Sequence, residues 1–415
     1  MDFLNEFDLA THIHRLGGNL WLVGGAVRDG ILRQPVHDMD FLATGLNPSD
    51  LPFDRVAGRA FPVFLVRVDG KTCELALARK ERKNGVGHSG FQFFTDASVS
   101  IEQDLARRDL TINAMAEDIL TGQIIDPFGG REDLKRGILR HTTDAFAEDP
   151  LRVFRVARFA AKFDFEVSRE TMALMRRLAP ELPLLPPERV WDETRKAIAA
   201  TARPSRFFKV LREAGALDAF FPEIAALDVP DKHDKTAFAH TMRVMDKGRT
   251  FKDRFGLLVH DFGKGLTPPE FHPNHYGHDK AGVEAVERFC RRLRVPNRLR
   301  KFGLLCAGEH MRIKRAAEMR PGKFVRWALG LEGHFNELLR VSFFDSVCRE
   351  GANLSEESER FRKINRMAQE VFDIRRRFTG RALVREGVRP GKHLGEILFQ
   401  RRVEAFKSSR PGFSP

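Results

Sequence analysis

Two aspartates, Asp38 and Asp40, stand on either side of Met39. On a β-strand, residues two apart point to the same face, so the two carboxylates would converge on one point. Paired carboxylates are hard oxygen ligands that suit Mg²⁺, an ion that activates an attacking hydroxyl and neutralises a leaving pyrophosphate. An isolated Asp-x-Asp is more often a solvated turn, so the pair predicts a magnesium site only together with its surroundings.

A glycine turn precedes the aspartate pair. Gly24-Gly25 ends an apolar run at residues 20–23, and Arg28 follows in a segment of helical character. Backbone N–H groups at the start of a helix hold phosphate oxygens, and a guanidinium pairs with them. A Gly-Gly turn alone is an ordinary connection between a strand and a helix, but the turn and the aspartates together predict a nucleotide site.

Further charged residues follow in the first third of the chain. Glu74, on a predicted strand, is a candidate third carboxylate, although a surface position is an equal alternative. Arg107 and Arg108 precede an apolar helical stretch and are interpreted either as phosphate or ribose ligands or as a solvated charge pair. The turn at residues 126–130, Asp-Pro-Phe-Gly-Gly, is predicted to be structural.

Asp149, Arg152, Arg155 and Arg158 recur every three residues in a predicted helix that begins near Pro150, with Asp149 as its cap. The ordinary interpretation is a capped helix with a solvated basic face. The alternative is base selection, because cytosine and adenine each present an amine donor beside a ring-nitrogen acceptor, which Asp149 and Arg152 match. Uracil and guanine would leave buried polar groups unpaired, at about 1–3 kcal/mol each.

A second set of candidate ligands lies in the C-terminal half of the chain. It comprises His240, the adjacent pair His260-Asp261, and Asp345. Histidine nitrogens and aspartate oxygens from separate helices make a divalent metal site. An ion there lowers the pKa of a bound water and directs it at a phosphoester. A lone His-Asp pair is more often a surface pair, so its neighbours decide the interpretation.

The predicted elements that position these residues are of two kinds. Up to about residue 140, β-branched and aromatic runs predict an α/β region with strands at 20–23, 38–43, 61–68 and 73–78. Charged, glycine-rich residues 79–90 predict a mobile loop. From residue 148 the apolar spacing is helical, with a helix at 151–163, a proline-rich break at 180–187 and a helical block at 188–216. Residues 221–235 are predicted to be a linker, the rest helical to about 380, and 408–415 frayed.

The composition narrows the class of protein. The 415 residues suggest about two to four domains, and a formal charge of +13 with a pI near 9.8 favours an anionic partner such as nucleic acid or an anionic membrane surface. The four cysteines have no CxxC spacing, which fits a reducing cytoplasm. No apolar run approaches the ~20 residues of a membrane span, and no signal peptide is evident. We therefore expect a cytoplasmic protein with no membrane segment.

Five motifs in order resemble those of the class II CCA-adding enzymes and their bacterial poly(A) polymerase relatives. They are LVGGAVRD at 22–29, DMD at 38–40, RRDLTINAM at 107–115, DPFGG at 126–130 and EDPLR at 148–152, with PERVW at 187–191 resembling a following motif. Any one motif could arise by chance, but five in order and at family spacing make the resemblance specific. It covers residues 20 to about 215 and implies an α/β polymerase-β-like nucleotidyltransferase head, followed by all-α neck and body regions that hold tRNA.

The resemblance also implies a role for each matching residue. Asp38 and Asp40 would be the catalytic, Mg²⁺-binding carboxylates of an enzyme that adds CCA to tRNA 3′ ends from CTP and ATP. Arg79 and the 79–90 loop resemble a flexible loop thought to matter for the switch to A addition. Asp149 and Arg152 would read the base. The implied nucleotide-binding residues are Gly25, Arg28, Arg108, Asp149, Arg152, Arg155 and Arg158.

The second half carries a separate resemblance. The string HDFGKGLTPPE at 260–270 resembles the HD phosphohydrolase domain of the multifunctional CCA enzymes of Gram-negative bacteria. This implies an all-α HD domain with phosphatase, 2′-nucleotidase and 2′,3′-cyclic phosphodiesterase activities. The implied ligands of a divalent transition-metal ion such as Ni²⁺ are His240, His260, Asp261 and Asp345. Outer-shell, substrate-binding and ordinary surface roles stay open for His275, His278 and His310, and the role of His233 is open.

We accordingly expect a head at residues 1–141, a base-selecting and RNA-binding neck at 142–226, an HD phosphohydrolase at 227–355 and a helical C-terminal segment at 356–415. Two alternatives remain. A poly(A) polymerase would share the head but usually carries a long basic extension in place of an HD domain. An HD hydrolase with a non-catalytic RNA-binding head is disfavoured by intact Asp38, Asp40, Asp149 and Arg152. The sequence predicts no oligomeric state.

Overall fold

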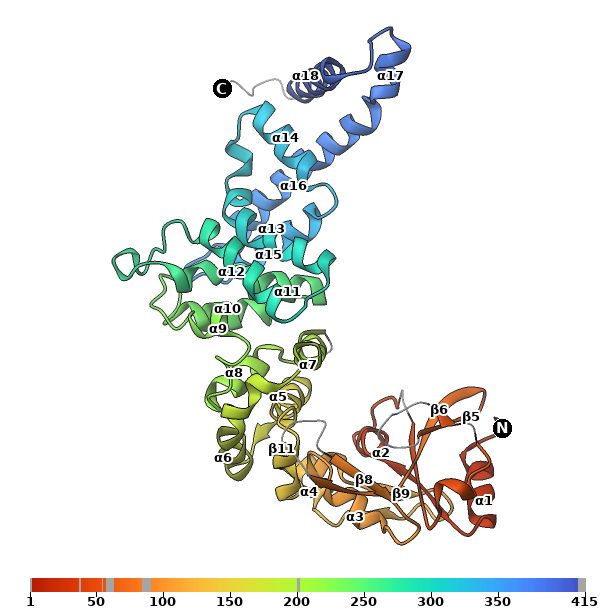
Figure 1. The fold of residues 1–415 in the computed structure, drawn as a ribbon. Coiled ribbons are helices and arrows are strands. Elements are labelled where there is room, and N and C mark those ends of the chain that lie inside the picture. The colour runs from red at the N-terminus through yellow and green to blue at the C-terminus, as the bar shows by residue number, and fades with distance from the viewer. Residues whose placement is uncertain are drawn as a thin grey trace. The chain divides into compact units, whose positions relative to one another are not determined.

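A computed structural model of the protein describes residues 2–36, 39–53, 55–56, 63–83, 91–199 and 202–409. The chain forms two compact units, Met1–Ala219 and Phe220–Pro415. The first unit contains the sheet of the head and a set of helices, whereas the second is helical (Figure 1). This arrangement confirms the predicted order of an α/β head followed by a largely helical region.

The head is built on one mixed sheet. Among the described residues its strands lie in the order β1 (Asp2–Phe3), β5 (Val63–Val68), β6 (Lys71–Leu77), β3 (Asp40–Thr44), β2 (Asn19–Val23), β9 (Ala116–Asp118) and β10 (Ile124–Ile125), with β4 (Arg55–Val56) paired to β5. The helices are α1 (Glu6–Arg15), α2 (Gly25–Ile31), α3 (Ile101–Ala106) and α4 (Gly130–Arg136). Strand β3 pairs parallel with β6 and antiparallel with β2.

The central strand β3 is apolar because both of its faces are covered. Successive strand residues point to opposite faces, and Phe41 packs into a cluster with Leu9 and Ile13 of α1. Leu42 packs into a second cluster with Leu105 of α3. Asp40 lies two residues before Leu42 and so shares the face that α3 covers. The four residues after Asp40 are buried, which gives a near-continuous apolar run instead of an alternating one.

One predicted loop is wrong over part of its length. Residues 79–90 were expected to be a mobile loop, but Arg79–Lys83 form strand β7, which pairs antiparallel with β8 (Phe91–Thr95). The charged run has no apolar alternation of its own, so its strand character comes from its backbone pairing with β8. Residues 84–90 of the predicted loop lie outside the described residues.

Helices complete the first unit. They are α5 (Arg152–Phe163), α6 (Arg169–Leu178), α7 (Pro187–Ala199) and α8 (Ser205–Glu213), and β11 (Ile138–Leu139) pairs with β12 (Glu166–Val167). Helix α5 packs against α7 and α8, with Phe154 and Phe207 fully buried. The block predicted at 188–216 is two helices, and the proline-rich break contains a 3₁₀ turn, Ala179–Leu184.

The second unit consists of helices. They are α9 (Pro222–Ala225), α10 (Ala237–Met245), α11 (Phe251–Val259), α12 (His278–Arg292), α13 (Asn297–Lys314), α14 (Pro321–Leu331), α15 (Phe335–Val347), α16 (Leu354–Arg377), α17 (Gly380–Arg385) and α18 (Lys392–Ser408). Helix α11 packs against α10, α13 and α15. A Cβ at Gly256 would lie 2.7 Å from Val341 and 2.9 Å from Cys306, so this glycine lets the three helices approach closely.

The linker predicted at residues 221–235 is wrong. Phe221, Ile224 and Leu227 are fully buried, and Pro222 begins α9. Pro at the first position of a helix costs no hydrogen bond, so the prolines that suggested a linker are compatible with a packed turn. The buried carboxylate of Asp231 binds Lys264, 2.6 Å away. The segment belongs to the second unit.

Two further predictions concern the C-terminal tail and membrane-spanning segments. Helix α18 ends at Ser408, and residues 410–415 of the predicted frayed tail lie outside the described residues. Across the part of the chain that the structure describes, no helix is both long and apolar enough to span a bilayer.

Candidate active sites

Asp40 and Glu74 lie next to each other in the head. Asp40 begins β3, and the parallel register pairs it with Glu74 of β6. Both residues are exposed. Paired residues on adjacent strands point to the same face of the sheet, so these two side chains share one face. Asp38 lies outside the described residues. The structure therefore brings the candidate third carboxylate beside Asp40.

The glycine turn at the end of β2 holds an arginine against its backbone. Gly24 has φ +68°, a conformation that glycine adopts without steric cost. A Cβ at Gly24 would lie 2.7 Å from Nη1 of Arg108. Arg108 also donates from Nη2 to Asp104, at 3.3 Å. Gly25 begins α2, so Arg108 lies beside the helix start that was predicted to hold phosphate.

Arg28 is tied to helix α5 and is not solvent-exposed. It donates from Nε to Asp29 at 2.8 Å and from Nη1 to the side chain of Asn113. Its guanidinium lies 5.3 Å from the ring centroid of Phe159 and 5.0 Å from that of Phe163. Burial lowers the pKa of Arg28, and Asp29 partly opposes that shift. Cation–π contact and burial together fix the position of this arginine.

One polar network joins three of the predicted nucleotide-binding arginines. Asn113 donates from Nδ2 to Asp109 at 3.0 Å, and Arg155 donates from Nε to the other oxygen of Asp109 at 2.7 Å. Glu193 of α7 accepts from Arg158 and lies 3.9 Å from Nη1 of Arg155. The members of the network are Arg28, Asn113, Asp109, Arg155, Glu193 and Arg158. The arginines are thus held by residues for which the sequence predicted no role.

Asp109 is the central anion of this network. Burial raises the pKa of the Asp109 carboxyl, but the Arg155 guanidinium and the hydrogen bonds from Asn113 and Arg155 outweigh that effect and hold the pKa below its usual value. The side chain is 6% exposed, whereas that of Arg155 is 36% exposed. The carboxylate is therefore ionised, and its loss would leave Arg155 without its main partner.

We expect Asp109→Asn to lower the free energy of unfolding of the α5 region by about 2–3 kcal/mol at pH 7, near the low end for a broken buried pair because Arg155 is partly exposed. A depressed folded-state pKa contributes stability above the unfolded value of about 3.9, and this contribution is lost as the pH falls through the folded value. The difference in unfolding free energy between the unchanged protein and Asp109→Asn should therefore shrink as the pH falls from about 4 towards the lower folded-state pKa of Asp109. Amide hydrogen exchange in α5 measures it.

Asp192→Asn is the matched control for this prediction. Asp192 lies on α7 and pairs with Arg195 and Lys196, but its side chain is 44% exposed. Exposed pairs contribute about 0–1 kcal/mol. An equal loss of protection in both variants would contradict a special role for the buried Asp109 pair.

Asp149 acts as a cap before α5, as predicted, although the helix begins at Arg152 and not near Pro150. Helix α5 begins at Arg152, and Asp149 precedes it in an extended conformation. Asp149 accepts the backbone N–H of Leu151 at 3.0 Å and lies 3.1 Å from Nη2 of Arg189. The predicted cap is therefore confirmed, and Arg152, Arg155 and Arg158 stand on the helix itself.

Arg152 donates to two backbone carbonyls. Its Nη1 donates to Ala145 at 2.7 Å and its Nη2 to Arg107 at 2.6 Å, and the residue is 9% exposed. The Ala145 carbonyl belongs to a 3₁₀ turn, Asp144–Glu148, and the Arg107 carbonyl follows α3. Arg152 therefore links the segment before α5 to the end of α3.

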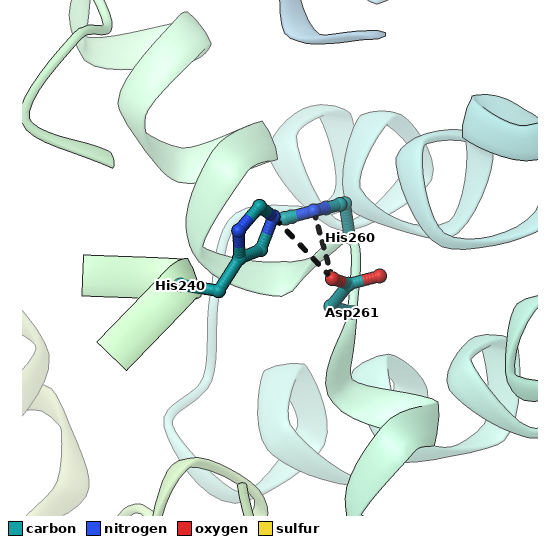
Figure 2. Close-up of side chains that lie close together, drawn as sticks. All are labelled: His240, His260 and Asp261. Carbon is teal, nitrogen blue, oxygen red and sulfur yellow. Dashed lines mark ion pairs between the residues drawn. The ribbon is translucent and has the colours of Figure 1, made fainter. Parts of the chain in front are cut away.

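The second unit brings all four predicted metal ligands together. His240 of α10 and Asp345 of α15 lie 3.0 Å apart, measured from Nε2 to Oδ1. Nε2 of His260 lies 3.2 Å from Oδ2 of Asp261 and 3.7 Å from Oδ1 of Asp345. Figure 2 shows the rings of His240 and His260 directed at the Asp261 carboxylate. The exposure of the four residues is 0–2%, so the group is fully buried.

The orientation of the His260 ring suits metal binding. Nδ1 of His260 lies 2.7 Å from the carbonyl oxygen of Leu257, and a carbonyl only accepts, so Nδ1 carries the proton. The other ring nitrogen, Nε2, then faces the carboxylates. Fixing one ring nitrogen on a carbonyl in this way is common for histidines that bind metals. Two imidazole nitrogens and two carboxylates form a donor set that fits a divalent ion.

Two buried lysines accompany the carboxylates. Nζ of Lys264 lies 2.8 Å from Asp261 and 2.6 Å from Asp231, and Lys314 donates to Asp345. Burial raises the pKa of Asp261, but His260 and Lys264 outweigh it, so the pKa lies well below the usual value. Burial lowers the pKa of His260, but the two carboxylates outweigh it and raise that pKa to about 9. The group favours a cation at the position that Nε2 of His260 faces.

The remaining histidines separate into two kinds. Oδ1 of Asp261 lies 3.4 Å from Nε2 of both His278 and His310. His275 is buried elsewhere, with its ring nitrogens bound to Thr267 and to the carbonyl of Pro230. The ring of His233 lies 6.5 Å from that of His240, centroid to centroid. Of the histidines left open by the sequence, His278 and His310 contact the metal-ligand group.

Several residues that complete these sites were missed. Asp109 and Asn113 lie inside the quoted RRDLTINAM motif, and Lys264 lies inside the HDFGKG string, but no role was predicted for them. Each of these residues places a charged or amide side chain among apolar neighbours, and this contrast is the sequence signal that could have identified it. Glu193 and Lys314 carry no comparable signal, because an isolated charge on a helix is usually solvated.

Comparisons with known proteins find family matches in the first half of the chain and relatives that cover most of its length. Residues 20–140 match the family described as Poly A polymerase head domain, and residues 164–227 match Probable RNA and SrmB- binding site of polymerase A. The multifunctional CCA protein of Burkholderia cenocepacia is 44% identical over 80% of this chain and 86% of its own length. That of Nitrosococcus oceani is 40% identical over 94% of this chain and 98% of its own.

Solved structures share the fold. A CCA-adding enzyme of Bacillus stearothermophilus, in complex with CTP, has a TM-score of 0.67 at 23% identity, covering 98% of this chain and 93% of its own. The Thermotoga maritima CCA-adding enzyme complexed with tRNA has a TM-score of 0.64 at 20% identity, covering 97% and 90%. At this level of identity the likeness concerns the fold alone.

Proposed function

Because the chain belongs to the family of the multifunctional CCA proteins, we propose that it adds CCA to tRNA 3′ ends from CTP and ATP and hydrolyses phosphoesters in its second unit. The observation that carries this function is 40–47% identity to relatives of that name over most of the chain. The buried His-Asp group supports the hydrolase, and the carboxylates on β3 and β6 support the transferase.

In the head, we assign Mg²⁺ binding to Asp38 and Asp40, with Glu74 beside Asp40. When bound, Mg²⁺ would activate the attacking hydroxyl of the RNA and neutralise the pyrophosphate. Arg108 lies against the glycine turn and is suited to contact phosphate. We assign nucleotide contacts to Gly25, Arg28, Arg108, Asp149, Arg152, Arg155 and Arg158. For Arg28, Arg155 and Arg158, whose described partners are protein groups, the contribution includes holding α2, α5 and α7 in place.

We propose that Asp149 and Arg152 select the base. Asp149→Arg combined with Arg152→Asp reverses donor and acceptor, and each mismatched buried polar group costs about 1–3 kcal/mol, so the preference for CTP and ATP over UTP and GTP should fall roughly 10-fold to 100-fold. The measurement is competition among the four nucleotides on trimmed tRNA.

Arg189→Gln is the control for this exchange, because it removes the ion pair of Asp149 and leaves both base-reading residues in place. We expect this variant to keep its preference for C and A. An active double variant with unchanged selectivity would overturn base reading by these two side chains.

In the second unit, we assign the ion to His240, His260, Asp261 and Asp345, and propose a divalent transition metal such as Ni²⁺, since imidazole nitrogen favours such ions over Mg²⁺. When bound, it would lower the pKa of a water ligand and stabilise charge on the phosphoester. Lys264 and Lys314 hold the carboxylates ionised and oriented. The proposed substrates are phosphate monoesters, 2′-nucleotides and 2′,3′-cyclic phosphodiesters.

We propose the functional regions 1–141 for the head, 142–226 for the neck, 227–355 for the HD phosphohydrolase and 356–415 for the C-terminal helical segment. The family matches at 20–140 and 164–227 support the first two. The compact units divide at residue 219, a few residues before the proposed neck boundary. We also propose a cytoplasmic location, since the four cysteines are free thiols and the proposed substrate is tRNA.

One assay tests the proposed function against its alternatives. Purified full-length protein is given tRNA trimmed at its 3′ end, with each labelled nucleotide offered separately and together. We expect ordered addition of C, C and A. Long A tracts would instead indicate a poly(A) polymerase, and phosphodiester cleavage without incorporation would indicate a hydrolase with an RNA-binding head.

A further inference from the structure

One buried carboxylate in the head binds both arginines of the pair that follows it in the chain. Asp104 of α3 is 0% exposed. Its Oδ1 accepts from Nε of Arg107 at 3.0 Å, and its Oδ2 accepts from Nη2 of Arg108 at 3.3 Å. The side chains of these two arginines are 18% and 20% exposed, so both reach the surface while their anion does not. Asp104 thus holds both arginines from the interior of the head.

The two oxygens of Asp104 have different partners. Besides Arg107, Oδ1 accepts the backbone N–H of Arg79 at 3.4 Å, where β7 begins. Helix α3 also packs against β7. Burial raises the pKa of Asp104, but Arg107 and Arg108 outweigh that effect and hold the pKa below its usual value, so the carboxylate is charged. Because several donors hold Oδ1, the carboxylate cannot rotate freely, and Oδ2 stays directed at Arg108.

The guanidinium of Arg108 is held on two sides at the glycine turn. Nη2 is bound to Asp104, and Nη1 donates to the carbonyl oxygen of Asn113 at 3.5 Å. A Cβ at Gly24 would lie 2.7 Å from Nη1, so a side chain there would displace Arg108 from this position. The next residue, Gly25, begins α2. Arg108 therefore lies beside a helix start, where backbone N–H groups bind phosphate oxygens.

Of the two arginines near this turn, Arg108 has donors to spare. Arg28 is 4% exposed, and its Nε, Nη1 and Nη2 are all bound, to Asp29 and to the side chain of Asn113. On Arg108, Nη1 and Nη2 each carry a second N–H beyond the bonds described above. Paired guanidinium donors suit phosphate oxygens. A phosphate contact at the start of α2 therefore suits Arg108 best, and the position of Arg108 depends on Asp104.

We propose that Asp104 is a positioning residue for nucleotide addition, which holds Arg108 on the glycine turn so that its remaining N–H groups meet the phosphates of the incoming nucleotide. This inference rests on the proposed transferase function. Asp104 contacts neither nucleotide nor metal and acts only through Arg108. Without the buried anion the guanidinium keeps its charge but loses its fixed position, and a misplacement of about 1 Å costs up to roughly 100-fold in rate.

The test compares a ligand that carries phosphates with one that carries none. The KM for CTP and the inhibition constant of cytidine are measured with full-length protein and trimmed tRNA. Asp104→Asn should raise the KM for CTP about 10-fold to 100-fold. The inhibition constant of cytidine should stay unchanged, because cytidine has no phosphate for Arg108 to contact. Arg108→Gln should act alike, and combining the two changes should add little, since both remove the same contact.

Asp133→Asn is the matched control, since Asp133 of α4 is 5% exposed and pairs with Arg140. It should lower thermal stability and change neither constant. Arg107→Gln serves if Asp104→Asn fails to fold, because it removes the main anchor of Oδ1 and should raise the KM for CTP alone, by a smaller factor.

An unchanged KM in folded Asp104→Asn protein would overturn the positioning role. So would equal weakening of CTP and cytidine, or effects of Asp104→Asn and Arg108→Gln that multiply independently. If the unchanged protein itself added no nucleotide to trimmed tRNA, the proposed transferase function would fail instead.

Discussion

Asp40→Asn is expected to lower the rate of nucleotide addition by at least about 10³-fold, because loss of a metal-binding carboxylate removes several kcal/mol of charge stabilisation and each 1.4 kcal/mol is tenfold in rate. Asp40 is exposed at the start of β3, so the fold should tolerate the change. Hydrolysis of a 2′,3′-cyclic nucleotide should be unaffected. Both rates are measured on the same preparation of full-length protein.

Asp8→Asn is the control for this variant. Asp8 is an exposed acidic residue in the first turn of α1, so replacing it by Asn removes the same charge from the head. We expect it to keep full nucleotide addition. If Asp40→Asn added CCA at the rate of the control, the assignment of the catalytic ion to β3 would be wrong.

Asp261→Ala should have the reverse effect. It removes the carboxylate that four buried histidines face, so hydrolysis should fall at least about 10³-fold and the proposed metal ion should no longer bind. Lys264 keeps Asp231 as a partner, 2.6 Å away, which limits the structural damage. Nucleotide addition to trimmed tRNA should remain, and metal content is measured alongside both activities.

Asp373→Asn is the corresponding control in the second unit, because Asp373 lies exposed on α16 and pairs only with nearby Arg376 among the contacts described for it. This variant should keep its metal and both activities. If Asp40→Asn or Asp261→Ala abolished both activities in a folded protein, two separable sites could not account for the enzyme.

The local order of the first unit was predictable because short-range chemistry dictates it. The apolar run 20–23 and Gly24 predicted a strand and a tight turn, and these are β2 and the start of α2. The change from alternating to helical spacing near residue 148 predicted the transition to helices. The resemblance of the HDFGKGLTPPE string predicted His240, His260, Asp261 and Asp345 as one set, and the structure brings these four residues together.

Other features depend on partners that are distant in sequence. The charged run Arg79–Lys83 is a strand because β8 pairs with it, and the proline-containing segment after residue 220 packs because Leu227 and Asp231 find buried partners. Arg189 from α7 pairs with Asp149, a contact that the predicted capping role of Asp149 did not reveal. None of these contacts leaves a local pattern, because each arises between segments that the fold brings together.

The same distinction applies to the two sites. Residue types and motif order predicted which chemistry the chain carries, because carboxylates suit hard cations, histidines suit transition metals and arginines suit phosphates wherever the fold places them. The roles of Asp109, Glu193, His278 and His310 depend on burial and on distances of 2.7–3.9 Å between separate elements. Burial makes an unpaired charge costly. Packing therefore determines which polar residues lie in the buried network of the first unit and which lie beside the predicted metal ligands of the second.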